Sequence, residues 1–303
     1  NRKDSPYLYL RFRRKAAIVF LESISPRKGK INMYKIFDVH THTYPEKIAA
    51  KAVKNLGEFY DFVPEGDGTY GGLSADAAKK GVRGFLLFSV ATNAHQVTSV
   101  NDCIAALAKK SREAGFETVG FAGMYQDFPD FEGEIDRCRK MGLRGVKLHP
   151  DFQKFYIDDP AVYPLYEIIQ ETQLPILMHM GDPHQTYSQP QRLAKVLKEF
   201  PKLRVIAAHL GGWERWEEAV VNLKADERLR FDTSSCSPFL PKDKMREIIQ
   251  HYGAENCFFG VDFPMWDHEE ELERFFALSL TDYENRRILS ENLIEWIHQT
   301  NKK

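Results

Sequence analysis

The sequence has few cysteines, almost no net charge and no long apolar run near its start, and each shortage excludes a class of protein. Only four cysteines occur in 303 residues, and none forms a Cys-x-x-Cys pair. This argues against a zinc ribbon or a thioredoxin-like redox site. We expect these scattered cysteines to be buried free thiols, as in a cytoplasmic protein. The formal net charge of −1 provides no overall field that would attract nucleic acid or an anionic membrane.

The small net charge conceals a basic leader. Residues 1–32 contain nine Lys or Arg and two acidic residues, whereas the rest of the chain has an excess of eight negative charges. The leader's one apolar run covers residues 16–21. That is shorter than a signal-peptide core of about 7–15 residues and far shorter than a membrane span of about 20. We therefore expect no membrane partner, and we expect residues 1–32 to lie outside a single domain at residues 33–303.

Eight short apolar segments follow the leader and alternate with longer amphipathic ones. They are rich in Val, Ile, Leu and Phe and nearly continuous in apolar character, which is typical of parallel strands buried on both faces. The predicted strands cover residues 35–42, 82–90, 118–125, 143–149, 175–181, 203–209, 229–234 and 257–262. Eight strand–helix units predict a single (β/α)8 TIM barrel. The alternative is an open doubly wound sheet, but its Gly-rich turn is missing after the first strand.

Amphipathic segments between the strands predict the helices. The predicted helices cover residues 49–59, 101–114, 132–141, 162–172, 192–199, 213–223, 242–251 and 284–299. Residues 61–72 are rich in glycine and acidic residues, and we expect a loop there over the mouth of the barrel.

Histidines gather where the predicted strands end. Five of the 10 histidines fall at these positions, on four different strands: His40, His42, His149, His179 and His209. Asp262 ends the last predicted strand. Active-site side chains of TIM barrels come from the C-terminal ends of the strands, so this pattern predicts one shared site at that end.

Strand alternation indicates where these side chains point. Because successive side chains face opposite sides of a strand, we expect His40 and His42 to share a face with Asp38, and Lys147 to share one with His149. So many buried polar groups are costly unless they are paired or bind a metal. Neutral imidazoles together with a carboxylate suit Zn²⁺ and similar divalent ions.

These residues belong to motifs that resemble a known family. The motifs are Asp-Val-His-Thr-His at 38–42, Gly-Val-Lys-Leu-His-Pro at 145–150, the isolated His179, His-Leu-Gly-Gly at 209–212 and Gly-Val-Asp-Phe-Pro at 260–264. In order and spacing the chain resembles the amidohydrolase superfamily of metal-dependent TIM barrels. More narrowly, it is similar to the amidohydrolase-related branch that includes aminocarboxymuconate-semialdehyde decarboxylase and resorcylate-type decarboxylases. The resemblance covers essentially residues 33–303.

The resemblance implies a role for each matching residue. His40, His42, His179 and Asp262 match the positions that bind one divalent metal, for which Zn²⁺ is expected and Mn²⁺ is the alternative. His209 matches the catalytic histidine, and Asp262 is expected to transfer protons. The superfamily's two-metal members use a lysine on the fourth strand, so Lys147 could bridge a second metal. His149 is left open between binding substrate in the pocket and hydrogen bonding behind it.

The same residues serve more than one reaction, so the fold and the metal do not choose among them. The resemblance favours a metal-dependent hydrolase acting on a small carbonyl or carboxylated substrate. The alternative is a non-oxidative decarboxylase of a small aromatic or unsaturated acid, and a more distant alternative is a metal-binding barrel without activity. A small-molecule substrate is expected in both enzymes, and barrels of this kind often form homodimers.

Overall fold

The computed structural model describes residues 33–300, so the predicted separate leader at residues 1–32 lies outside the described residues. The strands are β1 (Ile36–His42), β2 (Val82–Phe88), β3 (Glu117–Gly120), β4 (Ala122–Gly123), β5 (Val146–Leu148), β6 (Pro175–Met178), β7 (Arg204–Ala207), β8 (Leu229–Asp232) and β9 (Cys257–Phe258). β3 and β4 are two halves of one strand interrupted at Phe121, whose backbone N still donates to Leu87 O of β2 (2.9 Å). Each predicted strand is therefore confirmed, with shorter bounds in most cases.

The strands form a closed barrel. All neighbours are parallel, in the orders β1-β2-β3 and β4-β5-β6-β7-β8-β9. At the first seam, Arg144 N donates to Gly120 O (2.8 Å), and at the second, Asp262 N donates to His40 O (2.9 Å). These hydrogen bonds join the two sheets at both edges. They confirm the predicted TIM barrel and exclude the open doubly wound sheet, which would leave two edges unpaired.

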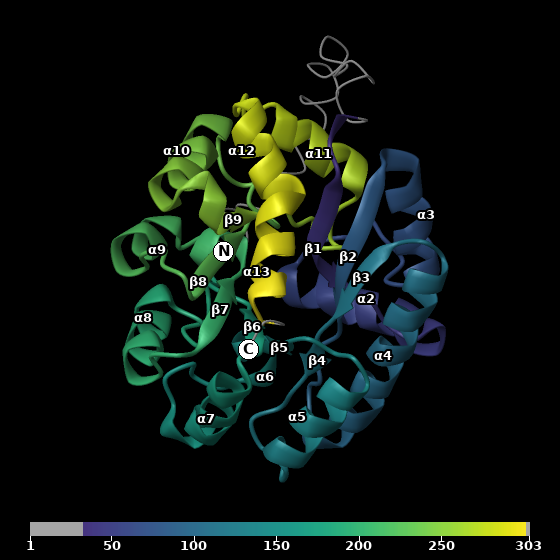
Figure 1. Cartoon of the computed structure of the whole chain (residues 1–303), viewed down its shortest axis with the longest axis vertical. Helices are drawn as coiled ribbons and strands as arrows, with labels where there is room; N and C mark the ends of the chain where they lie inside the picture. Colours follow the sequence, from purple (N-terminus) through teal and green to yellow (C-terminus); the bar gives the residue numbers. More distant parts are fainter. Residues whose placement is uncertain (1–32, 301–303) are drawn as a thin grey trace, which may run out of the picture.

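Helices surround the barrel, as Figure 1 shows. They are α2 (Glu46–Tyr60), α3 (Tyr70–Lys80), α4 (Val97–Glu113), α5 (Phe131–Lys140), α6 (Pro150–Gln153), α7 (Tyr163–Thr172), α8 (Pro190–Glu199), α9 (Trp216–Asn222), α10 (Lys242–Tyr252), α11 (His268–Phe276), α12 (Asp282–Arg286) and α13 (Asn292–Thr300). A π-helical turn, Arg287–Glu291, separates α12 from α13, so the predicted helix at 284–299 is interrupted rather than continuous.

Part of the predicted loop at 61–72 is helical. α3 begins at Tyr70, one residue after Thr69, whose hydroxyl accepts from Gly72 N (2.9 Å) and caps the helix. Two glycines in the first turn lower the helix propensity by about 1 kcal/mol each, which hid this start in the sequence. The remaining loop approaches the end of the last barrel strand, where Gly66 N donates to Pro264 O (2.9 Å). α11 was also not predicted.

Apolar side chains pack on both sides of the strands. One cluster lies between the strands and the surrounding helices, and it includes Phe85, Leu87, Ile176 and Val205. The alternate strand residues form a second cluster inside the barrel together with two residues of α13. Its buried members are Phe37, Val39, Leu86, Phe88, Phe121, Leu177, Ile206, Ala208, Phe258, Leu293 and Trp296.

The last helix closes the barrel at the N-terminal ends of the strands. Trp296 of α13 is 1% exposed and packs against Phe258 of β9, with ring centroids 5.7 Å apart. Arg204, the first residue of β7, lies over the same indole (4.0 Å) and donates to Trp296 O (2.8 Å). The opposite, C-terminal end of the barrel therefore remains available for a site.

Two further sequence expectations can be compared with the structure. The cysteines are free, as predicted, and three are buried: Cys138, Cys236 and Cys257. Cys103 differs because it is only half-buried. Within residues 33–300, no helix is both long and apolar enough to cross a membrane.

We predict that Trp296→Ala destabilises the protein. Removing this buried indole leaves a cavity at the base of the barrel, and such changes typically lower the free energy of unfolding by about 3–5 kcal/mol. Denaturant titration measures the loss. Val221→Ala on α9 is the control, because Val221 is 82% exposed and should change stability by less than about 0.5 kcal/mol. Equal effects of the two changes would contradict the role given to α13.

Candidate metal centre

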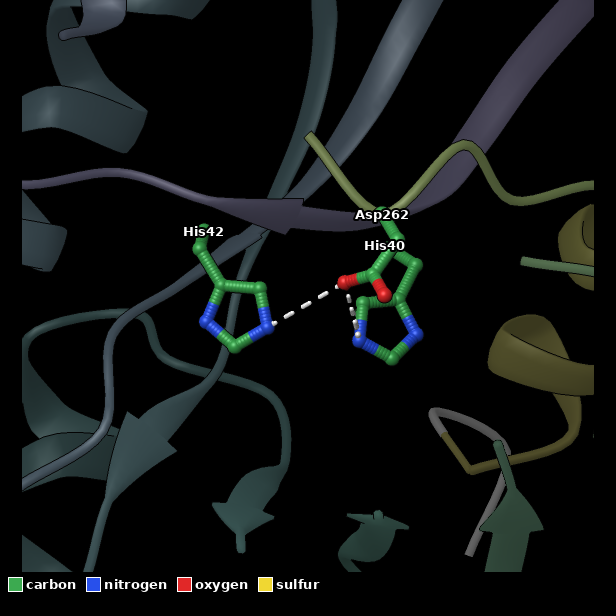
Figure 2. Close-up of side chains that lie close together, drawn as sticks. All are labelled: His40, His42 and Asp262. Atoms are coloured by element: carbon green, nitrogen blue, oxygen red, sulfur yellow. Dashed lines mark ion pairs between the residues drawn. The ribbon is translucent and has the colours of Figure 1, made fainter. Parts of the chain in front are cut away.

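Three side chains from the two ends of the barrel sequence meet at the C-terminal end of the strands. His40 and His42 come from the end of β1, and Asp262 follows β9. Asp262 Oδ1 lies 3.3 Å from His40 Nε2 and 3.5 Å from His42 Nε2. Figure 2 shows both imidazoles directed toward this one carboxylate. All three residues are buried, and their ligand atoms lie within 4.8 Å of one another, so the grouping is compact enough to hold one ion.

A second carboxylate fixes the orientation of His40. His40 Nδ1 lies 2.9 Å from Asp232 Oδ2 at the end of β8. A carboxylate oxygen accepts, so His40 carries its hydrogen on Nδ1 and presents an unprotonated Nε2 to Asp262. This carboxylate–histidine arrangement is the usual support of a metal-binding imidazole. Asp232 was missed by sequence reasoning, although it lies near the end of the strand predicted at 229–234.

Burial and neighbouring groups together set the charges of the two histidines and of Asp262. Burial lowers the pKa of both His40 and His42, and the nearby Lys147 amine lowers them further. Burial alone would raise the pKa of Asp262, but the attraction of His40 and the interaction with His42 outweigh it, so its pKa falls well below the usual range. Neutral imidazoles beside an ionised carboxylate are the forms that bind a divalent cation.

Lys147 belongs to the same centre. Its Nζ lies 3.2 Å from His40 Nε2 and 4.7 Å from the centre of the Phe88 ring, and the side chain is fully buried. Val146 and Leu148 pack on the helix side, so Lys147 faces the barrel interior, as alternation predicted. Burial lowers the pKa of Lys147 to about 8.

His209 occupies a sharp turn after β7. Its φ is +58° and that of Leu210 is +52°, a left-handed conformation that L-residues rarely adopt. His209 Nδ1 donates to Ser234 O (2.9 Å), because a carbonyl oxygen only accepts. Its Nε2 therefore points toward the centre and lies 3.0 Å from His179 Nδ1.

The His209 ring lies between His179 and the His40–His42–Asp262 group. His179 contacts His209 rather than the group itself, and its Nε2 lies 3.0 Å from Gly181 O. Its ring stacks on His149 at 3.8 Å between centroids. The structure thus brings together three of the four predicted metal ligands and places the fourth beside the predicted catalytic histidine.

His149 is held from both sides. Its Nδ1 accepts from Phe152 N (3.3 Å), so Nε2 carries the hydrogen and donates to the Tyr60 hydroxyl (3.0 Å). A further cluster of His149, Asp151 and His179 could in principle hold an ion. Because both nitrogens of His149 are already engaged, this cluster suits a cation less well than the His40–His42–Asp262 group.

A cavity opens beside these residues. Its polar lining consists of His179, His209, Asp262 and Ser235, and aromatic side chains supply most of the rest. Ser235 donates to Asp262 Oδ2 (2.6 Å) and accepts from Trp266 Nε1 (2.9 Å). The two predicted catalytic residues therefore line the same, largely apolar cavity, as in a small-molecule site.

A family model described as Amidohydrolase matches residues 37–298. The chain belongs to the amidohydrolase family. No curated protein matches it by sequence search.

Solved structures of similar proteins share the fold of this amidohydrolase. An uncharacterised TIM-barrel protein from Bordetella bronchiseptica superimposes with a TM-score of 0.67 at 21% identity, covering 88% of this chain and 100% of that one. A candidate 2-pyrone-4,6-dicarboxylic acid hydrolase from Pseudomonas putida superimposes with a TM-score of 0.63 at 16% identity, covering 87% of this chain and 97% of that one. 5-Carboxyvanillate decarboxylase from Novosphingobium aromaticivorans was solved in complex with manganese and a nitrobenzoic acid. It superimposes with a TM-score of 0.64 at 13% identity, covering 90% of this chain and 97% of that one.

One expectation about strand faces is wrong for this amidohydrolase. Asp38 does not share a face with His40, because its Oδ2 contacts His268 Nε2 (3.0 Å) at the start of α11, on the helix side of β1. The pairing of β1 with β2 shifts register between Asp38 and Thr41. Such a bulge interrupts the alternation of side chains, and it turns His40 toward the barrel mouth.

His268 is buried between two carboxylates. Its Nδ1 lies 2.6 Å from Asp76 Oδ2 on α3, and its Nε2 faces Asp38. Burial alone would lower the pKa of His268, but the hydrogen bonds with Asp38 and Asp76 outweigh it and raise the pKa to about 9. The sequence does not reveal this position, since nothing near His268 shows that residues 38 and 76 converge there.

We predict a pH-dependent stability that His268→Gln removes. The folded-state pKa of about 9 exceeds the unfolded value of about 6.5. The stabilisation is therefore fully present below about pH 6.5, is lost as pH rises through 9, and is on the order of 3 kcal/mol. Denaturant unfolding at pH 6 and pH 9.5 should show a larger deficit of the variant at pH 6. The exposed His251→Gln is the control, and an equal deficit of His268→Gln at both pH values would refute the charged state.

Proposed function

We propose that this amidohydrolase is a metal-dependent hydrolase of a small carbonyl compound. The observation that carries the proposal is the convergence of His40 Nε2, His42 Nε2 and Asp262 Oδ1 at the wall of the cavity. Three buried ligand atoms at the wall of a cavity lined mainly by aromatic side chains fit a Lewis-acid site better than a purely structural cluster.

We propose that His40, His42, His179 and Asp262 hold one divalent cation. Asp232 supports this assignment because it leaves His40 Nε2 as the only nitrogen of that ring free to bind. His179 is the proposed fourth ligand because it lines the same cavity as Asp262. Three histidines and a carboxylate suit Zn²⁺, and the manganese complex of the 5-carboxyvanillate decarboxylase makes Mn²⁺ the alternative.

We assign proton transfer to Asp262 and substrate positioning to His209. When bound, such a cation polarises a carbonyl oxygen and lowers the pKa of a water to about 7. Asp262, steadied by the Ser235 hydroxyl at Oδ2, takes the proton of the attacking water and passes it to the leaving group. His209 holds the water or the carbonyl oxygen through Nε2, because its Nδ1 is committed to Ser234 O.

Lys147 and His149 receive supporting roles. The Lys147 amine contacts His40 Nε2 directly, so we propose that it tunes a one-metal centre, and a second cation would require this lysine to act as the bridge. His149 holds the Tyr60 hydroxyl at the cavity wall, which supports a role on the substrate side rather than as a ligand.

Decarboxylation of a small carboxylic acid is the second candidate function. It is favoured by the position of His209 and Asp262, which both line the cavity and could each protonate a substrate carbon. A barrel that binds metal without turnover is the third. A screen of esters, lactones and aromatic acids that follows acid release and CO₂ release separately distinguishes all three. A cytoplasmic location and a homodimer stay predictions.

We predict that His42→Ala abolishes metal binding. The purified protein should contain about one Zn²⁺ or Mn²⁺ per chain, and the variant should contain only background metal, because a ligand is lost. Metal analysis after dialysis measures both. His95→Ala is the matched control, since His95 is exposed in the short helix Ala94–Gln96 and is not one of the proposed ligands. Two ions per chain would reassign Lys147 as a bridge, and unchanged metal in His42→Ala would refute the ligand set.

We predict that His209→Asn keeps the metal and loses activity. Removing a group that orients or transfers a proton typically lowers kcat by about 10²–10⁴-fold, while the ligand atoms stay in place. Metal content, melting temperature and steady-state kinetics measured together separate the effects. His184→Asn is the control, because His184 follows the same strand as His179 but does not line the cavity. Loss of metal in His209→Asn would make His209 a ligand instead.

A further inference from the structure

Trp213 carries a buried hydrogen-bond donor that no acceptor of the protein takes up. The residue lines the cavity and is 5% exposed. Within residues 33–300, its Nε1 has no hydrogen-bond partner. Because nearly all buried polar groups of folded proteins are hydrogen bonded, an exception in a cavity wall points to a ligand that supplies the acceptor.

The other three tryptophans of the chain do not share this feature. Each of them donates through Nε1 to an oxygen of the protein: Trp216 to His209 O (3.0 Å), Trp266 to the Ser235 hydroxyl (2.9 Å) and Trp296 to Glu227 O (3.2 Å). The fold therefore satisfies its indole donors as a rule, and the exception lies beside the proposed metal centre.

Aromatic rings, rather than oxygens, surround the indole of Trp213. The ring centroids of Tyr60 and Phe239 lie 5.2 and 5.4 Å from that of Trp213, at interplanar angles of 85° and 83°. A ring face is only a weak acceptor for an N–H group, so these contacts do not replace the missing oxygen. Phe239 is half-buried, so its ring can turn aside and admit an oxygen of a ligand to Nε1.

The main chain fixes Trp213 beside the proposed catalytic histidine. Trp213 N donates to Met180 O, just after β6 (2.7 Å). Gly181 packs so closely here that a Cβ on it would lie 2.4 Å from Trp213 N. Because Trp213 follows His209 in the same turn after β7, one piece of backbone positions both side chains.

Trp213 and Asp262 lie at different places along the cavity wall. The Phe239 ring contacts those of both Trp213 and Trp266, with centroids 5.4 and 6.0 Å apart, and Trp266 reaches Asp262 through the Ser235 hydroxyl. A planar ligand with one oxygen at the proposed cation can therefore lie along Phe239 and bring a second oxygen to Trp213. Because the cation offsets the negative charge of Asp262, the first oxygen can belong to a carboxylate.

We propose that Trp213 determines specificity by donating a hydrogen bond from Nε1 to a second oxygen of the substrate. The substrate class is a planar aromatic or unsaturated compound whose carboxylate or carbonyl faces the proposed cation and whose ring carries a further oxygen acceptor. This inference rests on the proposed metal-dependent function for the place of the substrate, and it holds for hydrolysis and decarboxylation alike.

The first test compares ligands that differ in one acceptor atom. 3-Acetylbenzoate and 3-isopropenylbenzoate have the same shape, with an oxygen in one where the other has a CH₂ group, and the corresponding 4-isomers cover a longer spacing. Calorimetric titration of the zinc-loaded protein gives each dissociation constant. In at least one pair the acetyl compound should bind at least about fivefold more tightly, because a buried donor left unpaired costs about that much. Equal or weaker binding of the acetyl compound in both pairs, or no binding of any compound, overturns the proposal.

A matched pair of variants tests whether Trp213 sets the preference. Trp213→Phe removes the donor and keeps a ring, so the preference for the acetyl compound should fall by at least about fivefold. Phe62→Leu is the control, because Phe62 lines the same cavity and carries no polar side-chain atom. The control should weaken both ligands and keep their affinity ratio. An unchanged ratio in Trp213→Phe, or an equal change in Phe62→Leu, contradicts the proposal.

Indole NMR tests the contact in the unaltered protein and does not depend on a variant that folds. Isotope-labelled tryptophan gives four indole N–H signals, one for each tryptophan. The acetyl ligand should shift one signal downfield, as hydrogen-bond formation does, and the isopropenyl ligand should not. Absence of this shift overturns the proposal whether or not a substrate is turned over. If the shift occurs but no substrate is turned over, the proposed function fails and the role of Trp213 in binding stands.

Discussion

One carboxylate oxygen ties together the two chain segments that carry the metal centre. Asp38 Oδ1 accepts hydrogen bonds from His40 N (2.9 Å) and from Val261 N (3.0 Å), the residue before Asp262. Both backbone donors are buried at the barrel seam, where an unpaired N–H is costly. The separation of His40 Nε2 and Asp262 Oδ1 is therefore set by the main chain as well as by flexible side chains. The charge of His268 on the other oxygen of Asp38 keeps this acceptor in place.

The geometry of the metal centre also depends on hydrogen bonds among its buried polar groups. Asp232 accepts from His40 Nδ1, from the backbone N of His209 and Ser234, and from the Ser234 hydroxyl. A single side chain thus positions a proposed ligand and the proposed catalytic histidine together. Removing it would leave several buried donors unpaired, which costs about 1–3 kcal/mol for each. The orientation of the imidazoles is consequently built before any cation or substrate arrives.

The sequence predicted the barrel and much of the centre because both depend on local pattern. Eight apolar runs indicate eight strands, and residues at the ends of parallel strands must meet at one end of a barrel, which brought His40, His42 and Asp262 together. What failed depended on contacts between distant segments. The bulge after Asp38 leaves no mark in composition, so the face of Asp38 was wrong. The burial of His268 was not predicted because its partners, Asp38 and Asp76, lie 230 and 192 positions away.

The two ends of the barrel divide stability from chemistry. At the N-terminal end, Trp296 and the interior cluster bury apolar surface against α13. At the C-terminal end, non-glycine residues adopt left-handed backbone angles directly after the strands, with φ of +58° at His209, +52° at Ser235 and +71° at Asp262. Such angles cost on the order of 1–3 kcal/mol each and persist only where surrounding structure enforces them. Each of these residues is held there by a side-chain hydrogen bond within the centre. The strained turns thus depend on the hydrogen bonds of the centre itself, and they aim His209 and Asp262 into the cavity rather than along the strands from which they come.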